Sequence, residues 1–178
     1  MLIVALDLAT QTGVAVGDPG RPPRAFSVDL GKSKSEDFRF SKALTLTHQL
    51  IQEHKPDLIV IEAPVGGPKT SHFLVGLVAC VRGCCFNRGV ALESHSIAAI
   101  RKHFLGGHVT SAHYKHLPER ARKGAARKDG KDAVMNRCRA LGWQVADDNA
   151  ADAMALWDFA ASHKNHAHAV MTAGGLGL

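Results

Sequence analysis

The sequence predicts an α/β protein with a mixed central sheet. Short continuous apolar runs, typical of strands buried on both faces, recur along the chain. Strands come first and then alternate with segments of helical spacing, which favours strands and helices in one layered domain. The chain has 178 residues, 46% of them hydrophobic. It is therefore long enough to bury its own core, and wholesale disorder is excluded.

The N-terminal half is expected to contain most of the sheet. The small polar segment ATQT separates two apolar runs and so favours a tight turn between two strands. Phe40, Leu44 and Ile51 fit the apolar face of a helix that stops before Pro56. The expected elements are strands at residues 2–6, 13–16 and 26–30, a helix at 38–54, a strand at 58–61 and a loop at 63–69.

The C-terminal half is expected to be mostly helical. Ser96 is a suitable cap for a short helix, and the polar, basic stretch 106–130 has the composition of a flexible segment. The expected elements are a helix at 71–86, a strand at 89–92, helices at 96–104 and 131–141, a brief apolar segment at 143–145, and a last helix from 148 to about 162. Residues 1–162 form one expected domain, and the tail at 163–178 is expected to be frayed.

Several broad classes are excluded by composition. No apolar run approaches the ~20 residues of a membrane span, so we expect no membrane association. We expect no signal peptide in the first residues, because they lack a basic region and Asp7 interrupts the apolar run. The four cysteines lack the paired spacing of a zinc site and are interpreted as reduced. A cytoplasmic protein is the expectation.

Basic residues are concentrated in one stretch of the chain. The formal net charge is +6, and residues 101–140 hold eleven of the 22 Lys and Arg but only three acids. Such a local surplus favours a polyanionic partner bound through its phosphates, although a solvated loop is the alternative. The candidate DNA-binding residues are Lys69, Arg120, Arg122, Lys123, Arg127, Lys128 and Lys131.

Four carboxylates occupy positions that a purely structural role does not favour. Asp7 and Glu62 end apolar strands, and Asp148 and Asp152 lie four residues apart on one helix face. Ligand sites of α/β sheets collect at strand ends. Convergent carboxylates without a matching Cys/His set suit Mg²⁺ or Mn²⁺, and two such ions can activate water against a phosphodiester. Taken singly, Asp148 could be a helix N-cap and Asp7 a turn residue.

The three acidic motifs together resemble the RuvC group of Holliday-junction resolvases, in the RNase H-like superfamily. The resemblance rests on Asp7 within LDLATQTGVAV, Glu62 within LIVIEAP and the closing DDNAADAMAL, and it covers about residues 1–160. It implies an RNase H-like fold, a homodimer, and Mg²⁺-dependent paired nicking of four-way DNA junctions. It also assigns Asp7, Glu62 and Asp152 to metal binding. Lys131, within GKDAV, resembles the family's lysine near the active site.

The sequence departs from the family's commonest pattern in the last helix. Many members place two acids three residues apart, whereas here Asn149 stands three before Asp152 and Asp148 stands four before it. Both acids are therefore candidate catalytic and metal-binding residues. The loop after Glu62 also lacks the aromatic residue sometimes used near the junction centre. Phe73 is the nearest candidate for that wedge, with core packing as the alternative.

Other functions remain to be separated from junction cleavage. The same fold could cut RNA or other branched DNA, or the chain could be a non-catalytic junction-binding module. A phosphate-binding fragment of the actin and sugar-kinase type is disfavoured, because 178 residues are too few for two such domains. The apolar stripe of residues 73–84 could be a dimer interface or simple core.

Overall fold

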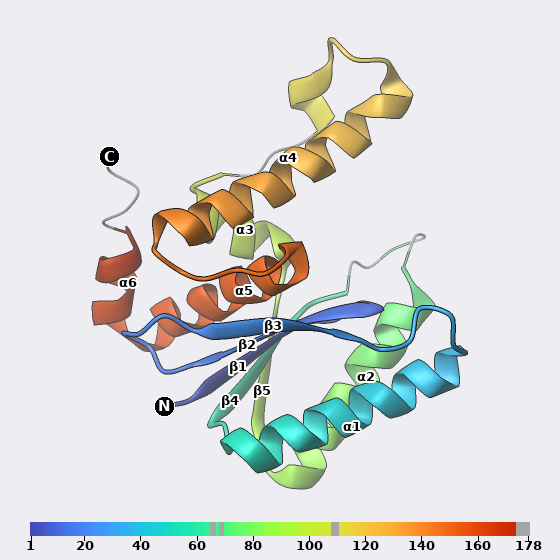
Figure 1. Ribbon diagram of the computed structural model, residues 1–178, viewed down its shortest axis with the longest axis vertical. Coiled ribbons are helices and arrows are strands. Elements are labelled where there is room, and N and C mark those ends of the chain that lie inside the picture. Colours follow the sequence, from blue (N-terminus) through green and yellow to red (C-terminus); the bar gives the residue numbers. More distant parts are fainter. Residues whose placement is uncertain (65–66, 68–69, 108–110, 174–178) are drawn as a thin grey trace.

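The computed structural model, which describes residues 1–64, 67, 70–107 and 111–173, contains a five-stranded mixed sheet (Figure 1). The strands are β1 (Ile3–Asp7), β2 (Gln11–Gly17), β3 (Arg24–Asp29), β4 (Leu58–Glu62) and β5 (Ala91–His95). Their order across the sheet is β3-β2-β1-β4-β5. The first three strands form an antiparallel meander, and β4 and β5 run parallel to β1. The predicted α/β fold with a mixed sheet is confirmed.

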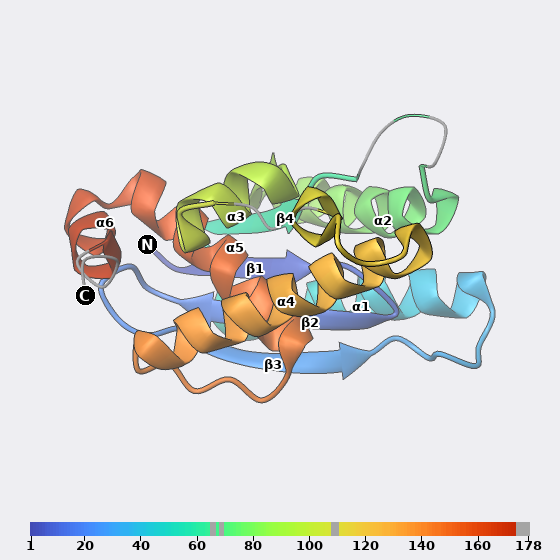
Figure 2. The same ribbon diagram turned by 90° about the horizontal axis from the view of Figure 1, so that it is seen from above.

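Helices cover both faces of the sheet. They are α1 (Glu36–His54), α2 (His72–Arg88), α3 (Ile97–Leu105), the short 3₁₀ helix η1 (Ser111–Tyr114), α4 (Glu119–Ala140), α5 (Asp148–Lys164) and α6 (His166–Ala173). Figures 1 and 2 show α1 and α2 on one side of the sheet, and α3, α4 and α5 on the other. Among the described residues, no helix is long and apolar enough to cross a membrane.

The alternation of side chains along each strand fills two separate cores. Ile3 and Ala5 of β1 pack toward the α3–α5 side, whereas Val4 and Leu6 pack toward α1 and α2. Residues at successive strand positions point to opposite faces, so a continuous apolar run marks a strand covered on both sides. The same rule sends Asp7, two residues beyond Ala5, to the α5 side.

Helix α5 packs tightly against the centre of the sheet because small residues meet there. Gly13 of β2 faces the first turn of α5, where an added Cβ would lie 2.0 Å from the carbonyl oxygen of Asn149 and 3.1 Å from the Cβ of Ala153. Trp157 is fully buried and donates its indole N–H to the carbonyl of Gly17 at 3.2 Å. The helix is thereby fixed in position over β1 and β2.

The stretch expected to be flexible is mostly helical. The helix predicted at 131–141 begins at Glu119, so α4 is twice as long as predicted, and η1 precedes it. Arg, Lys and Ala are good helix formers, and they outweigh the two glycines in this segment. Ala126, Val134 and Cys138 bury one side of the helix in the core. Composition alone had suggested a loop because it ignores this spacing.

Two smaller expectations were also wrong. Strand β5 spans residues 91–95 rather than 89–92, because Gly89 is the left-handed cap of α2. The tail is not frayed over residues 166–173, which form α6.

Helix α6 is held by a buried polar contact that the sequence did not reveal. His168 is 2% exposed and lies 2.9 Å (Nε2) from the Oδ1 of Asp158, which is itself 2% exposed. The Nδ1 of His168 accepts the backbone N–H of Gly20 at 3.1 Å. The ring proton is therefore on Nε2, donated to Asp158. His103 contacts the other oxygen of Asp158 at 3.0 Å, so α3, α5 and α6 meet at one carboxylate.

Candidate active site

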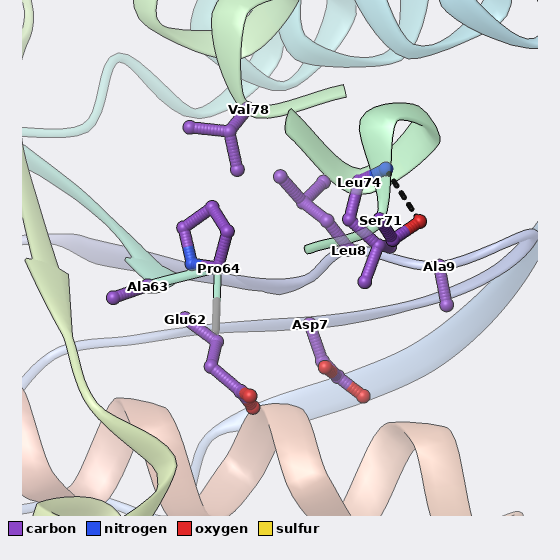
Figure 3. A pocket seen from close by; sticks show the side chains of 9 residues that line it. All are labelled: Asp7, Leu8, Ala9, Glu62, Ala63, Pro64, Ser71, Leu74 and Val78. Carbon is purple, nitrogen blue, oxygen red and sulfur yellow. Dashed lines mark hydrogen bonds between the residues drawn. The ribbon is translucent and has the colours of Figure 1, made fainter. Parts of the chain in front are cut away.

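Two acids stand side by side where β1 and β4 end. Leu6 of β1 pairs in parallel register with Ile61 of β4, so the next residues, Asp7 and Glu62, are neighbours at the same edge of the sheet. They line a cavity of about 380 Å³ together with the start of α2. In Figure 3 both carboxylates point toward α5 and away from Leu74 and Val78 of α2. The strand-end acids are thus brought together as the sequence suggested.

A third carboxylate, Asp152, reaches this pair from α5. Its charge raises the pKa of both Asp7 and Glu62, so it lies within electrostatic reach of each. The close packing of α5 on Gly13 carries the helix to this position. All residues from 150 to 161 except Asp152 are buried. Asp152 is therefore the one partly exposed side chain of this stretch.

The carboxylates resist ionisation because too much negative charge is gathered in a desolvated place. Burial, and then the charges of Asp152 and Glu62, raise the pKa of Asp7 to about 8. Burial and the charge of Asp152 raise the pKa of Glu62 to about 7. Burial also raises the pKa of Asp152. Positive charge placed among these groups would favour their ionised forms.

Two basic side chains already neutralise part of this charge. Arg101 of α3 donates to Asp152 at 3.2 Å, and both side chains are largely buried. Gly130 of α4 makes room for it, since a Cβ there would lie 2.4 Å from the Arg101 guanidinium. Sequence reasoning missed Arg101 as a site residue. The available clue was the position of Arg101, which directly follows the apolar run IAAI in a short helix.

Lys131 and Asp148 form the second ion pair. The ammonium of Lys131 contacts Asp148, and this hydrogen bond is the main cause that lowers the pKa of the Asp148 carboxyl. Asp148 in turn acts on Asp152, whose pKa its charge raises. The charge of Lys131 lowers the pKa of Asp7, which places the lysine near the acid cluster.

The N-cap of α5 is Asp147 and not Asp148. The carboxylate of Asp147 accepts the backbone N–H of Ala150 at 2.8 Å and the hydroxyl of Ser27 at 2.6 Å. The interpretation of Asp148 as a cap is therefore wrong. Because Asp147 satisfies the helix terminus, the Asp148 side chain is free to pair with Lys131 at the rim of the site.

The acid cluster has the donor chemistry of a magnesium or manganese site. Hard divalent cations take carboxylate oxygens, and added positive charge would offset the burial and mutual repulsion that raise the pKa of Asp7 and Glu62. As the side chains stand, no group of three His, Cys, Asp or Glu within the described residues is close enough to hold an ion. Asp152 faces Arg101 instead. A metal ion bound by Asp152 would share that carboxylate with Arg101 or displace the guanidinium from it.

The predicted DNA-binding residues fall into different environments. Lys69 lies outside the described residues. Arg127 is exposed, and its charge lowers the pKa of Asp152. Arg122 donates to the backbone carbonyls of Leu117 at 2.9 Å and Lys115 at 3.0 Å, so it braces the turn before α4. The remaining candidates on α4 outside the ion pairs are exposed: Arg120, Lys123 and Lys128.

Phe73 packs as a core residue rather than projecting as a wedge. Its ring stacks on Phe40 at 5.7 Å between centroids, and the Arg39 guanidinium lies 4.3 Å from the ring centre. Farther along α2, Leu77 and Val81 are fully buried. Most of the stripe that could have been a dimer interface is thus core, whereas the exposed large side chains of α2 are Val75 and Phe86.

Comparison with solved structures shows that this chain shares its fold with RuvC. It is similar to RuvC of Thermus thermophilus, with a TM-score of 0.64 and 16% identity over 92% of this chain and 96% of that one. The T. thermophilus RuvC in complex with a Holliday junction substrate gives 0.66 and 13%, over 92% and 95%. No family model and no curated protein sequence matches the chain. The predicted RNase H-like fold and the resemblance to RuvC are confirmed in three dimensions.

Proposed function

We propose that this protein is a metal-dependent endonuclease that resolves four-way DNA junctions. One observation carries the proposal: Asp7 and Glu62 stand together where β1 and β4 end, and Asp152 of α5 lies within electrostatic reach of both, in a chain with the fold of RuvC. A structural role does not account for three clustered carboxylates with raised pKa values. The T. thermophilus structure that this chain resembles holds a Holliday junction substrate, which supports the choice of DNA.

In this proposal the acidic residues of the site bind the metal ions, and the basic residues contact the phosphate. Asp7, Glu62 and Asp152 would hold Mg²⁺ or Mn²⁺, with Asp148 as the outer candidate. Two such ions would supply an activated water and stabilise the leaving oxygen of the phosphodiester. Arg101 and Lys131 lie beside these carboxylates, where their positive charge would stabilise the charged phosphoryl group in the transition state.

A homodimer is part of the proposal. Paired nicks on a four-way junction need two active sites that face opposite strands, and each chain provides one. The exposed Val75 and Phe86 of α2, the latter 87% exposed, support an apolar contact between two copies. Light scattering during gel filtration would measure a mass of two chains, and a single-chain mass would contradict this part.

The decisive experiment compares the wild-type protein with its Asp7→Asn variant on a mobile four-way junction with Mg²⁺. We expect symmetrical nicks from the wild type and none from the variant, while both bind the junction. Thermal unfolding followed with Mg²⁺ should show stabilisation of the wild type alone. Equal cutting by both proteins would refute the catalytic assignment. Tight binding without cutting by either would identify a binding module.

Substrate choice is tested on the same protein. Linear duplex DNA, duplex RNA and a three-way branch are offered in competition with the labelled junction at fixed salt. Preference for the junction supports the proposal, because shape rather than sequence would then select the substrate. Faster cleavage of RNA would assign the chain to another branch of RNase H-like nucleases.

A further inference from the structure

The N-terminal half of α4, together with η1, forms an arm that stands away from the sheet (Figure 1). The arm comprises residues 111–129 and lies within the stretch expected to be a flexible loop. The buried residues of α4 are Ala126, Gly130, Val134 and Cys138, whereas residues 119–121, 123, 124 and 127–129 are exposed. The arm is thus a helical extension of a helix that the core holds in place.

Internal contacts give the arm a defined shape. The hydroxyl of Tyr114 in η1 donates to the carboxylate of Asp129. Arg122 donates from its guanidinium to the carbonyls of Leu117 and Lys115. These contacts fasten η1 back onto α4, and they engage Asp129, which is one of the arm's two helical acids.

Basic residues of α4 form one straight row that ends at the carboxylates. Arg120, Lys123, Arg127 and Lys131 are spaced by three, four and four residues, so they fall within an arc of about 80° on the helix. We call these four residues the basic row. Lys131 contacts Asp148, and the charge of Arg127 reaches Asp152. Arg122 points to another side, where it braces the arm.

We infer that the basic row is a rail for the phosphates of the DNA strand that is cut, leading outward from the active site. The inference rests on the proposed nuclease function and specifies how that site holds its substrate. Eleven residues of helix extend about 16 Å, and one DNA strand advances about 3.4 Å per nucleotide. The row therefore matches the axial length of about five nucleotides on one side of the scissile phosphate.

The chemistry of the row favours a backbone over bases. All four members are cations, and no aromatic side chain is interleaved on which a base could stack. Lys and Arg contacts to phosphate release condensed counterions, so each contact steepens the salt dependence of binding. The row would therefore align the strand and lengthen the footprint without reading its sequence.

The test measures the affinity for a junction when phosphates are neutralised, when basic side chains are neutralised, and when both are. All proteins carry Asp7→Asn so that no DNA is cut. Junctions carry a block of uncharged methylphosphonates at the second to fifth linkages on either side of the expected cut. The variant is Arg120→Gln/Lys123→Gln. Its matched control is Lys55→Gln/Arg139→Gln, which removes two exposed charges, one before β4 at the opposite edge of the sheet and one near the far end of α4.

The expected results concern both salt and position. Loss of two phosphate contacts should reduce the slope of log affinity against log salt by about 1.8, which is roughly tenfold less weakening between 50 and 200 mM salt. The neutral block on one side should weaken binding by the parent protein more than binding by the arm variant, which keeps only Arg127 and Lys131 of the row. The control should behave like the parent protein, and Arg120→Lys/Lys123→Arg should restore binding.

An unchanged slope in the arm variant would overturn the inference. The same loss from the neutral block in the parent and the arm variant would also overturn it, because the block would then act elsewhere. Cleavage by the protein with an intact Asp7 is measured separately on an unmodified junction. Failure to cut refutes the nuclease proposal, whereas the binding measurements alone decide whether the row follows a strand.

Discussion

Substitution of Gly13 by alanine tests whether the packing of α5 on β2 sets the geometry of the site. The new Cβ would lie 2.0 Å from the carbonyl oxygen of Asn149 and 2.6 Å from its carbonyl carbon. Both atoms belong to the backbone of the first turn of α5, so no side-chain rotation can relieve the clash. Since real Cβ contacts essentially never fall below 3.0 Å, the two elements must separate by about 1 Å.

That separation has a cost in stability and a larger one in activity. Overpacking of this kind costs about 1–3 kcal/mol, which corresponds to a fall of roughly 2–12 °C in the midpoint for a chain of this size. Asp148 and Asp152 lie on the helix that moves, whereas Asp7 and Glu62 stay on the sheet. Misplacement of catalytic groups by 1 Å can reduce a rate by about 10²-fold.

The assay combines thermal unfolding with single-turnover cleavage of a four-way junction in Mg²⁺. Gly124→Ala is the control, because nothing lies within 4 Å of its added Cβ and alanine favours the helix by up to about 1 kcal/mol. We expect Gly13→Ala to lose far more rate than its stability loss explains at a temperature where it is folded. Wild-type stability and rate in Gly13→Ala would refute the reasoning.

Three further predictions concern charge and burial. Between about pH 4 and 8 the folded protein holds a proton on Asp7 that the unfolded chain releases, so the free energy of unfolding should fall as pH rises. Urea unfolding in EDTA should show this fall in the wild type and a flatter dependence in Asp7→Asn. Gly130→Ala should push Arg101 from its acid partner and slow cleavage, with unfolding changed by less than about 1 kcal/mol; an unchanged rate would count against a role for that arginine. His168→Ala should leave buried Asp158 short of a donor, which costs about 1.5–3 kcal/mol and exposes α6 to limited proteolysis; wild-type resistance to protease would show that α6 is held by other contacts.

Strands and strand ends were predictable from the sequence, whereas the arrangement of charge was not. Apolar runs before Asp7 and Glu62 identified buried strands, and parallel pairing then placed both acids at one edge. Asp152 followed from its helix spacing. Arg101 did not, because its partner is distant in sequence and its space depends on a glycine of α4. Such contacts arise only when three helices meet.

The long α4 and the docked α6 were missed for a related reason. Composition predicts flexibility where basic and glycine residues accumulate, yet a helix needs only a few well-spaced apolar positions to be anchored. Ala126, Val134 and Cys138 provide them in α4. In α6 the anchor is His168. Its partners Asp158 and Gly20 lie 10 and 148 residues away in the sequence, and no local pattern links them to it.

Because α5 is buried on nearly every side, substitutions in it affect both the stability of the fold and the position of the catalytic acid. A substitution at any residue from 150 to 161 other than Asp152 changes a buried side chain. It therefore also disturbs the packing of the helix that carries Asp152. Random mutation of this segment would therefore rarely yield stable, inactive proteins, apart from changes at the acid itself. Selection for folding and selection for cleavage act there on the same positions. The segment should accept little variation even where the chain evolves toward a different substrate.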